Sequence, residues 1–475
     1  RVTRSWSYGE AIADPRTGQI LKGQVTLGSL RARQDYMIAE ALLAPYMEGK
    51  PIPPDMEQMV LARTRQLAAH EVGHTLGLQH NFAASSVTFG NSVMDYPHPW
   101  ITLDASGKPM LDKAYSTVIG AWDIAAIKYG YAQFAQGSNE AAQLNDLLKQ
   151  NDAAGLRFMA DEDARPLGSA HPYAHLWDNG PDATVELNRI LEVRKAALAR
   201  FGVDAIRPGQ PMSQIADTLV PLYLLHRYQT EATAKLIGGL DYRYAVRGAT
   251  AAETGMVTQM IAPERQRKAL AAVLETLDSD VLTLSPDFLA MLPPNPPGYP
   301  RTPESFAGYT GLTFDPQGAV EAAANLTASL LFEPTRASRL VEYHAIDAKE
   351  PSLSEVIDEI LQTTWEEPRQ SGLAQQTQFT VDTVVLNHLM QLAVSKQASP
   401  QARAVAMSQI ANLQAWLTDQ LDIELTQGVE AHWSSALDSI ERFWKEPQKY
   451  EVAPPLATPP GQPIGSEEDD EFSVN

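Results

Sequence analysis

Cysteine does not occur among the 475 residues of the chain, so disulfides, thiolate catalysis, iron–sulfur clusters and cysteine-rich zinc sites are excluded. Basic residues are scarce, because 37 Lys and Arg stand against 58 Asp and Glu and give a formal net charge of −21. An acidic chain repels phosphate groups, so we expect neither nucleic acid nor anionic lipid as a main partner. No apolar run approaches the ~18 residues that a membrane-spanning helix needs, so no membrane span is expected.

The composition of the chain, with 44% hydrophobic and 20% charged residues, is that of a globular protein. Its length predicts two or three domains of about 150 residues each. The first predicted domain, residues 1–150, opens with strands and turns, and residues 14–18 (DPRTG) have the composition of a hairpin turn. Helices are predicted at 33–47, 54–78 and 120–133, with an irregular stretch at 81–113.

Helical patterns dominate after residue 150. They are predicted at 184–201, 212–236, 262–277, 352–365, 381–395, 400–421 and 427–443, with one hairpin that pairs 242–247 with 256–261. A proline-rich stretch at 293–300 indicates a boundary between a helical region with one hairpin, 151–292, and an α-helical C-terminal domain, 293–453. Residues 454–475 hold prolines and an acidic run, and we predict a disordered acidic tail there.

Three of the ten histidines lie between residues 70 and 80, in the sequence HEVGHTLGLQH. On a helix, residues i and i+4 lie one above the other, so His70 and His74 can face one ion. Glu71 leaves the helix about 100° from His70, next to the ion, which is the place of a general base for an attacking water. Gly77 permits a left-handed turn that brings His80 back as the third nitrogen ligand. Three protein nitrogens with one open position are typical of catalytic zinc.

With the spacing HExxHxxGxxH and a later methionine turn, the chain resembles the metzincin zinc endopeptidases. The chain is more similar to the large bacterial Met-zincin metalloproteases, because it contains HEVGHTLGLQHN, the upstream DPRTG and SVMDY at 92–96. Its later part resembles them only in general, for instance in WDNGPD at 177–182 and PPGYPRT at 296–302. The resemblance implies an α+β fold, in which a zincin-like catalytic domain with a small sheet and an active-site helix precedes a mostly α-helical C-terminal region. It also implies one catalytic Zn²⁺ and, together with the lack of cysteine, a secreted or periplasmic protein.

The resemblance implies roles for two residues that follow His80. Met94 would form the methionine turn beneath the histidines, where a thioether fills space without competing for the ion. Tyr96 matches a tyrosine that some metzincins place at the metal or the oxyanion, and a tyrosine packed in the cleft wall is the alternative. Asn81 departs from the acid or other marker that several metzincin branches carry after the third histidine, so the chain is not assigned to a branch.

A second stretch is rich in oxygen donors and could hold Ca²⁺, which extracellular proteases often use. It lacks EF-hand spacing, so a polar loop that caps the helix from Thr184 is the alternative. The residues concerned are Asp161, Glu162, Asp163, His171, His175, Asp178, Asn179 and Asp182.

The residues before His70 supply at most three strands for the sheet that must cover the active-site helix. A lone hairpin is marginal in stability. We therefore expect an N-terminal segment of the same precursor, encoded before Arg1, to complete the sheet. The alternative is that the C-terminal helices fold back over the same surface.

Together these observations predict a zinc metalloendopeptidase that acts on peptide or protein substrates. Glu71 would take a proton from the attacking water and deliver it to the leaving amine. An extended substrate could pair with the strand predicted at Gln19–Leu27. The alternative is a protease-like binding or scaffold protein with a structural metal site and a helical partner-binding region. Glu71 argues against this alternative, because a structural metal site needs no general base.

Overall fold

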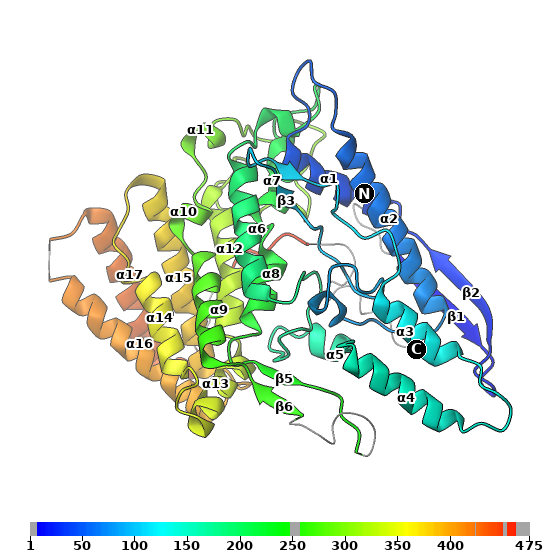
Figure 1. Ribbon diagram of the computed structural model, residues 1–475. Helices are drawn as coiled ribbons and strands as arrows, with labels where there is room; N and C mark the ends of the chain where they lie inside the picture. The colour runs from blue at the N-terminus through cyan, green and yellow to red at the C-terminus, as the bar shows by residue number, and fades with distance from the viewer. Residues whose placement is uncertain (1–6, 248–256, 423, 450–453, 462–475) are drawn as a thin grey trace.

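The computed structural model describes residues 7–247, 257–422, 424–449 and 454–461. A long helix, α2 (Pro54–Thr75), and a β-hairpin form one side of the molecule, and a stack of helices forms the other (Figure 1). Irregular segments and short helices lie between these two parts. The α+β character predicted from the sequence agrees with this mixture of many helices and small sheets.

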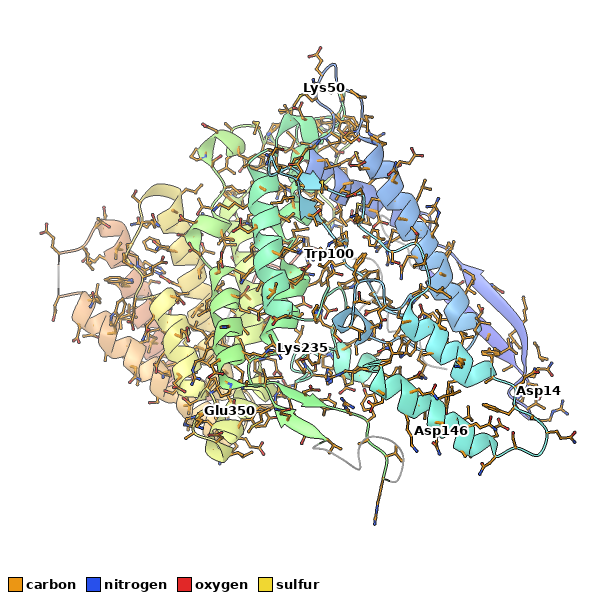
Figure 2. The ribbon with its side chains drawn as sticks, in the orientation of Figure 1. Asp14, Lys50, Trp100, Asp146, Lys235 and Glu350 are labelled. Atoms are coloured by element: carbon orange, nitrogen blue, oxygen red, sulfur yellow. The ribbon has the colours of Figure 1, made fainter. Side chains whose placement is uncertain are left out.

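The hairpin consists of β1 (Tyr8–Ala13) and β2 (Ile20–Thr26), which pair antiparallel. Its turn is closed by Asp14, whose carboxylate accepts hydrogen bonds from the backbone and side chain of Arg16. This confirms the turn predicted from DPRTG, and Asp14 lies at the outer tip of the hairpin (Figure 2). Both strands pack on α2.

Two helices follow the hairpin. The first, α1 (Leu30–Leu43), ends sooner than predicted because Ala44 adopts a left-handed conformation immediately before Pro45. The second, α2, begins with a proline in its first turn and two acidic residues beside it, a sequence suited to a helix N-terminus. Its buried residues recur every three or four positions from Met56 to His70, so one side of the helix faces the interior.

The remaining sheets are small. Strand β3 (Thr102–Leu103) pairs with β4 (Pro109–Met110), and β5 (Leu240–Tyr242) pairs with β6 (Thr258–Met260). The second pair is shorter than the predicted hairpin, of which residues 248–256 lie outside the described part of the chain. Every sheet of the described residues has two strands. The additional N-terminal segment expected beside α2 stays a prediction.

The helices and 3₁₀ turns that follow α2 are η1 (Ala84–Ser86), α3 (Ala121–Tyr131), α4 (Glu140–Ala153), α5 (Asp161–Ala164), α6 (Ala183–Leu198), η2 (Val203–Ala205), α7 (Gln214–Tyr223), α8 (Arg227–Ala234), α9 (Pro263–Glu275), α10 (Ser279–Leu282), α11 (Pro286–Leu289), α12 (Pro316–Leu331), α13 (Pro334–Ile346), α14 (Leu353–Thr363), α15 (Gly372–Val394), α16 (Pro400–Gln420), α17 (Gln427–Lys445) and η4 (Pro447–Lys449). No described helix is both long and apolar enough to cross a membrane.

Most predicted helices are present, with ends that differ by a few residues. The single helix predicted at 212–236 is wrong, because the chain forms α7 and α8 with a break after Tyr223. Pro221 lies inside α7 and cannot donate a backbone hydrogen bond, which favours an end of the helix close to this position. Helices α4, α12 and α13 were not predicted, and α15 begins nine residues before its predicted start at 381.

A large hydrophobic core runs through the molecule from Ile38 on α1 to Phe443 on α17. A smaller cluster, which includes Leu67, Tyr96 and Trp177, lies behind the histidines. The domain boundaries predicted at 150 and 292 stay predictions. Within the predicted tail, residues 454–461 pack on α12, since the Leu456 N–H donates to Glu321 and Thr458 Oγ1 donates to the Ala322 carbonyl. Residues 462–475 lie outside the described part of the chain.

Candidate metal centre

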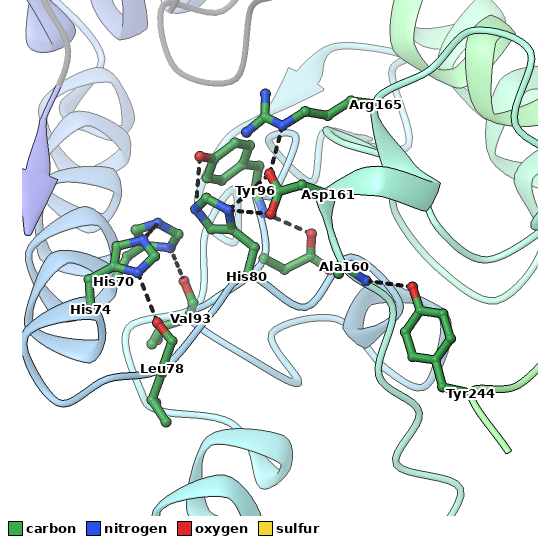
Figure 3. Close-up of polar contacts among 11 residues, drawn as sticks. His70, His74, Leu78, His80, Val93, Tyr96, Ala160, Asp161, Arg165 and Tyr244 are labelled. Atoms are coloured by element: carbon green, nitrogen blue, oxygen red, sulfur yellow. Dashed lines mark hydrogen bonds and ion pairs between the residues drawn. The ribbon is translucent and has the colours of Figure 1, made fainter. Parts of the chain in front are cut away.

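The last two turns of α2 carry His70 and His74, and the chain then turns back to present His80. Gly77 adopts a left-handed conformation with φ of 84°, which confirms the predicted sharp exit from the helix. One ring nitrogen from each histidine lies within 4.8 Å of the others, and Nε2 of His70 is 3.0 Å from Nε2 of His74. The structure therefore brings all three predicted ligands together (Figure 3).

The opposite ring nitrogen of each histidine has an acceptor of its own. Nδ1 of His70 donates to the Val93 carbonyl at 2.6 Å, and Nδ1 of His74 donates to the Leu78 carbonyl at 2.9 Å. Nδ1 of His80 donates to the Asp161 carboxylate at 2.9 Å (Figure 3). Because these acceptors cannot donate, each Nδ1 carries the proton and each Nε2 presents a lone pair, which in His80 accepts from the Tyr96 hydroxyl.

This arrangement fits a zinc ion. Three imidazole nitrogens with their protons held on the far side form the donor set of catalytic zinc sites. Two nitrogens bound at about 2.0–2.1 Å in a tetrahedron are about 3.3 Å apart, close to the 3.0 Å between the Nε2 atoms of His70 and His74. Burial, reinforced by the neighbouring histidines, holds the pKa of His70 well below its ordinary value and lowers the pKa of His74 to about 4. Both rings are therefore neutral at pH 7, as metal ligands must be.

Glu71 follows His70 directly on α2 and is buried, with 2% of its surface exposed. Burial raises the pKa of its carboxyl group to about 7, and the positive charge of Arg63 opposes this rise. A carboxyl group with a pKa near neutrality can both accept and release a proton at physiological pH.

Tyr96 lies beside the third histidine. Its hydroxyl group is 3.0 Å from Nε2 of His80, on the side that faces the other histidines (Figure 3). The ring contacts Phe82 and Trp177, and burial raises the pKa of the phenol. The backbone of Trp177 is left-handed, with φ of 67°, and its N–H donates to the Tyr96 carbonyl. A bulky residue adopts this conformation only where the surrounding structure stabilises it. The hydrogen bond from Trp177 therefore helps to fix the backbone of Tyr96.

Met94 packs directly against α2 and is fully buried. A Cβ atom added to Gly73 would lie 2.3 Å from the sulfur of Met94, so any other residue at this point of the helix would force the buried thioether to move. The turn around Met94 is fixed by Asp123, which accepts hydrogen bonds from Ser92 Oγ and the Val93 N–H. Met94 thus packs against the helix that carries His70 and His74, and its role as the floor residue stays a prediction.

Three residues with a part in this site were not recognised from the sequence. Asp161 on α5 binds His80 and is itself bound by Nε of Arg165 at 2.6 Å. Burial opposes its ionisation, but the hydrogen bond from His80 and the charge of Arg165 lower its pKa to about 2. Asp123 orders the methionine turn, and Asn81 joins this turn to the segment before α5 through the Met94 carbonyl and the Met159 N–H.

The calcium site suggested by the oxygen donors at 161–182 is not supported. Among the residues that the structure describes, only His70, His74 and His80 form a group of three such ligands. The donors point to separate partners: Asp163 binds Tyr242 and Tyr244, Asp178 binds Ser85, and His175 binds Glu231. Asp182 caps α6 through the Thr184 N–H, as the alternative reading of this loop expected. Lys235, labelled in Figure 2, is buried and donates to the carbonyls of Ala164 and Ala174 in this loop.

Comparison with known families gives one match. The family model described as Met-zincin matches residues 53–372, from the start of α2 to the start of α15. The match covers two thirds of the chain and includes every residue of the site described above. Comparisons with curated proteins and with solved structures gave no match.

Proposed function

Because the chain belongs to the Met-zincin family of zinc metalloproteases, we propose that it is an endopeptidase whose catalytic centre consists of Glu71 and the three histidines. The observation that carries this proposal is the set of Nδ1 hydrogen bonds. They leave an Nε2 lone pair on each histidine for a metal ion, and the residue that follows His70 on α2 is the buried acid Glu71. A site that is only structural has no use for a buried acid next to its ligands.

In this proposal the three histidines bind the metal and Glu71 transfers the proton. His70, His74 and His80 hold zinc, which when bound lowers the pKa of a water molecule towards ~7 and polarises the peptide carbonyl. Glu71 takes a proton from the attacking water and passes it to the leaving amine. Its pKa near 7 suits both transfers.

Hydrolysis of casein tests this function. We expect the zinc-loaded full chain to cut casein at internal bonds, which mass spectrometry of the products identifies. Products that arise only by loss of terminal residues would contradict an endopeptidase. Zinc-loaded protein that leaves casein and short peptides intact would favour the binding or scaffold alternative.

Tyr96 is proposed to donate its hydroxyl hydrogen to the oxyanion that develops on the substrate. This hydroxyl lies next to His80 on the side of the metal centre, and its raised pKa keeps it protonated at pH 7. We expect Tyr96→Phe to lower kcat by about 10- to 1000-fold with little change in KM or in zinc content. Steady-state kinetics with a fluorogenic peptide measure this effect.

Tyr115→Phe is the matched control, since Tyr115 is also buried but its ring contacts Arg63, two turns before His70 on α2. Equal kcat values for Tyr96→Phe and wild type would make Tyr96 a residue of the cleft wall and remove it from the mechanism.

Asp161 is proposed as a positioning residue for the third ligand. Its carboxylate holds the proton of His80 on Nδ1 and fixes the ring so that Nε2 points towards the other histidines. We expect Asp161→Asn to weaken zinc binding by about 10- to 100-fold. Competition with a chromogenic chelator measures this affinity independently of activity.

Asp163→Asn is the control, because Asp163 lies on the same short helix but binds Tyr242 and Tyr244. Its zinc affinity should stay within about twofold of wild type, since it does not touch a ligand. An Asp161→Asn variant with wild-type zinc affinity would show that His80 needs no carboxylate to orient it.

A further inference from the structure

A wide groove begins at the loop that leads from α2 to His80. It has a volume of about 1620 Å³ and is lined by Leu76–Gln79, one face of α3, the segment 156–159, strand β5 and the tip of the β1–β2 hairpin. These elements lie together around the C-terminal end of α2 (Figure 1). Nothing in the proposed chemistry uses this space.

One wall of the groove is an apolar face of α3, the helix that packs beside α4. Trp122, Ala125, Ala126 and Tyr129 recur at helical spacing and all line the groove. In α3 only Asp123 is fully buried, so the apolar face is left open to the groove. The two alanines form a shallow floor between the larger rings.

The adjoining wall is aromatic. The ring of Phe158 stacks on Trp122 with 6.0 Å between centroids and an angle of 11°, and Tyr244 meets Phe158 edge-on at 6.2 Å. Phe158 and Tyr244 nevertheless keep 36% and 50% of their surfaces exposed. Such a continuous, exposed aromatic surface is typical of binding sites, because isolated soluble proteins cover large apolar patches.

The charged groups of the groove neutralise one another. Arg157 binds Asp241 at 2.9 Å, and Arg243 binds Asp152 at 2.6 Å. These four residues are the only Asp, Glu, Lys or Arg among the described lining residues. The walls therefore offer apolar surface and hydrogen-bonding groups, and a charged occupant would gain little from them.

The size and position of the groove indicate the kind of occupant. A volume of about 1620 Å³ exceeds the ~300–1,000 Å³ of small-molecule pockets and suits a stretch of polypeptide. Leu78 and Gln79 line the groove and immediately precede His80. Tyr244, on the adjoining wall, accepts a hydrogen bond from the N–H of Ala160, which precedes Asp161 (Figure 3). The groove thus adjoins the two segments that lead into His80 and Asp161.

We infer that this groove binds an uncharged stretch of the substrate polypeptide rich in Phe, Tyr, Trp and Leu, away from the bond that is cleaved. The inference rests on the proposed endopeptidase function and adds its substrate class. Folded proteins bury such stretches, so the preferred substrates are unfolded polypeptides.

Peptide binding to a filled groove tests this inference. The background is the zinc-loaded, full-length Glu71→Gln variant, in which bound peptide is not consumed. Ala126→Trp places a large ring on the floor of the groove, and Ile124→Trp places the same ring on the exposed outer face of α3, where Ile124 is 57% exposed. Fluorescence anisotropy then measures binding of a fluorescein-labelled peptide that contains a block of Phe, Leu and Tyr, and of a matched peptide with Ser, Asn and Thr in that block.

We expect the apolar peptide to bind more tightly than its polar partner, and Ala126→Trp to weaken its binding by about tenfold or more. Ile124→Trp should stay within about twofold of the background. Phe158→Ala, which removes a ring without filling the groove, should weaken binding by about two- to tenfold and serves if Ala126→Trp does not fold. Equal affinity for both peptides, or no effect of either groove variant, overturns the inference.

Cleavage of casein by the wild type separates the two proposals. If casein is cut but the groove variants bind the apolar peptide normally, the groove inference fails and the endopeptidase stands. If casein is not cut but the groove variants lose the apolar peptide, the groove is a binding site and the endopeptidase proposal fails.

Discussion

Glu71→Gln is expected to lower kcat by about 10²–10⁴-fold while one zinc ion per chain is retained. Glutamine has the size of glutamate but cannot accept the proton of the attacking water. The side chain is buried beside His70 without being one of the three ligands, so the metal centre should be unaffected. Initial rates with a fluorogenic peptide and elemental analysis of the same sample give both quantities.

Glu57→Gln is the matched control, because Glu57 lies exposed in the first turn of the same helix. Its kcat should equal that of the wild type. If Glu71→Gln cleaves peptides at the wild-type rate, the general base is another group and the proposed mechanism is wrong.

Removal of zinc is expected to abolish peptide cleavage without unfolding the protein. Each histidine keeps its Nδ1 hydrogen bond to Val93, Leu78 or Asp161, so these bonds and the buried core persist without the ion. Purified protein should contain one zinc per chain, lose activity with a chelator and regain it when zinc is added. The far-UV circular dichroism spectrum should stay unchanged throughout.

His74→Ala should reduce both the zinc content and the activity to background, because two ligands remain of the three. His344→Ala is the control, since His344 lies on α13 and its Nδ1 bonds to the Glu350 carbonyl. A zinc content near zero in the wild type that added zinc cannot raise would refute the metal centre. Loss of the helical spectrum on chelation would make zinc structural instead of catalytic.

The proposed ligands and base could be predicted because they lie close together in the sequence. Helical periodicity places His70 and His74 on one face, and the glycine turn at Gly77 returns His80, so local geometry is sufficient. Asp161 lies 81 residues beyond His80, and only the packing of the intervening helices brings the two together. In the sequence Asp161 is one acid among several neighbours, and nothing local distinguishes it from Asp163.

The limits of the fold prediction have a similar origin. Amphipathic helices such as α14 and α17, which have one apolar and one polar face, were predicted because their apolar residues recur with a clear helical period. Helix α12 is rich in alanine and buried around most of its circumference, so it lacks a polar face that would reveal its period. The break between α7 and α8 depends on how Leu224–His226 pack in the core, which periodicity does not report.

The close contact between Gly73 and Met94 makes two separate motifs depend on each other in evolution. Any side chain at position 73 would displace the Met94 sulfur, so a larger residue there favours a smaller one at position 94. Related sequences should therefore change these two positions together or not at all. A designer who wishes to move this metal centre to another scaffold must transplant the helix and the methionine turn as one unit, with Asp123 to hold the turn against the helix.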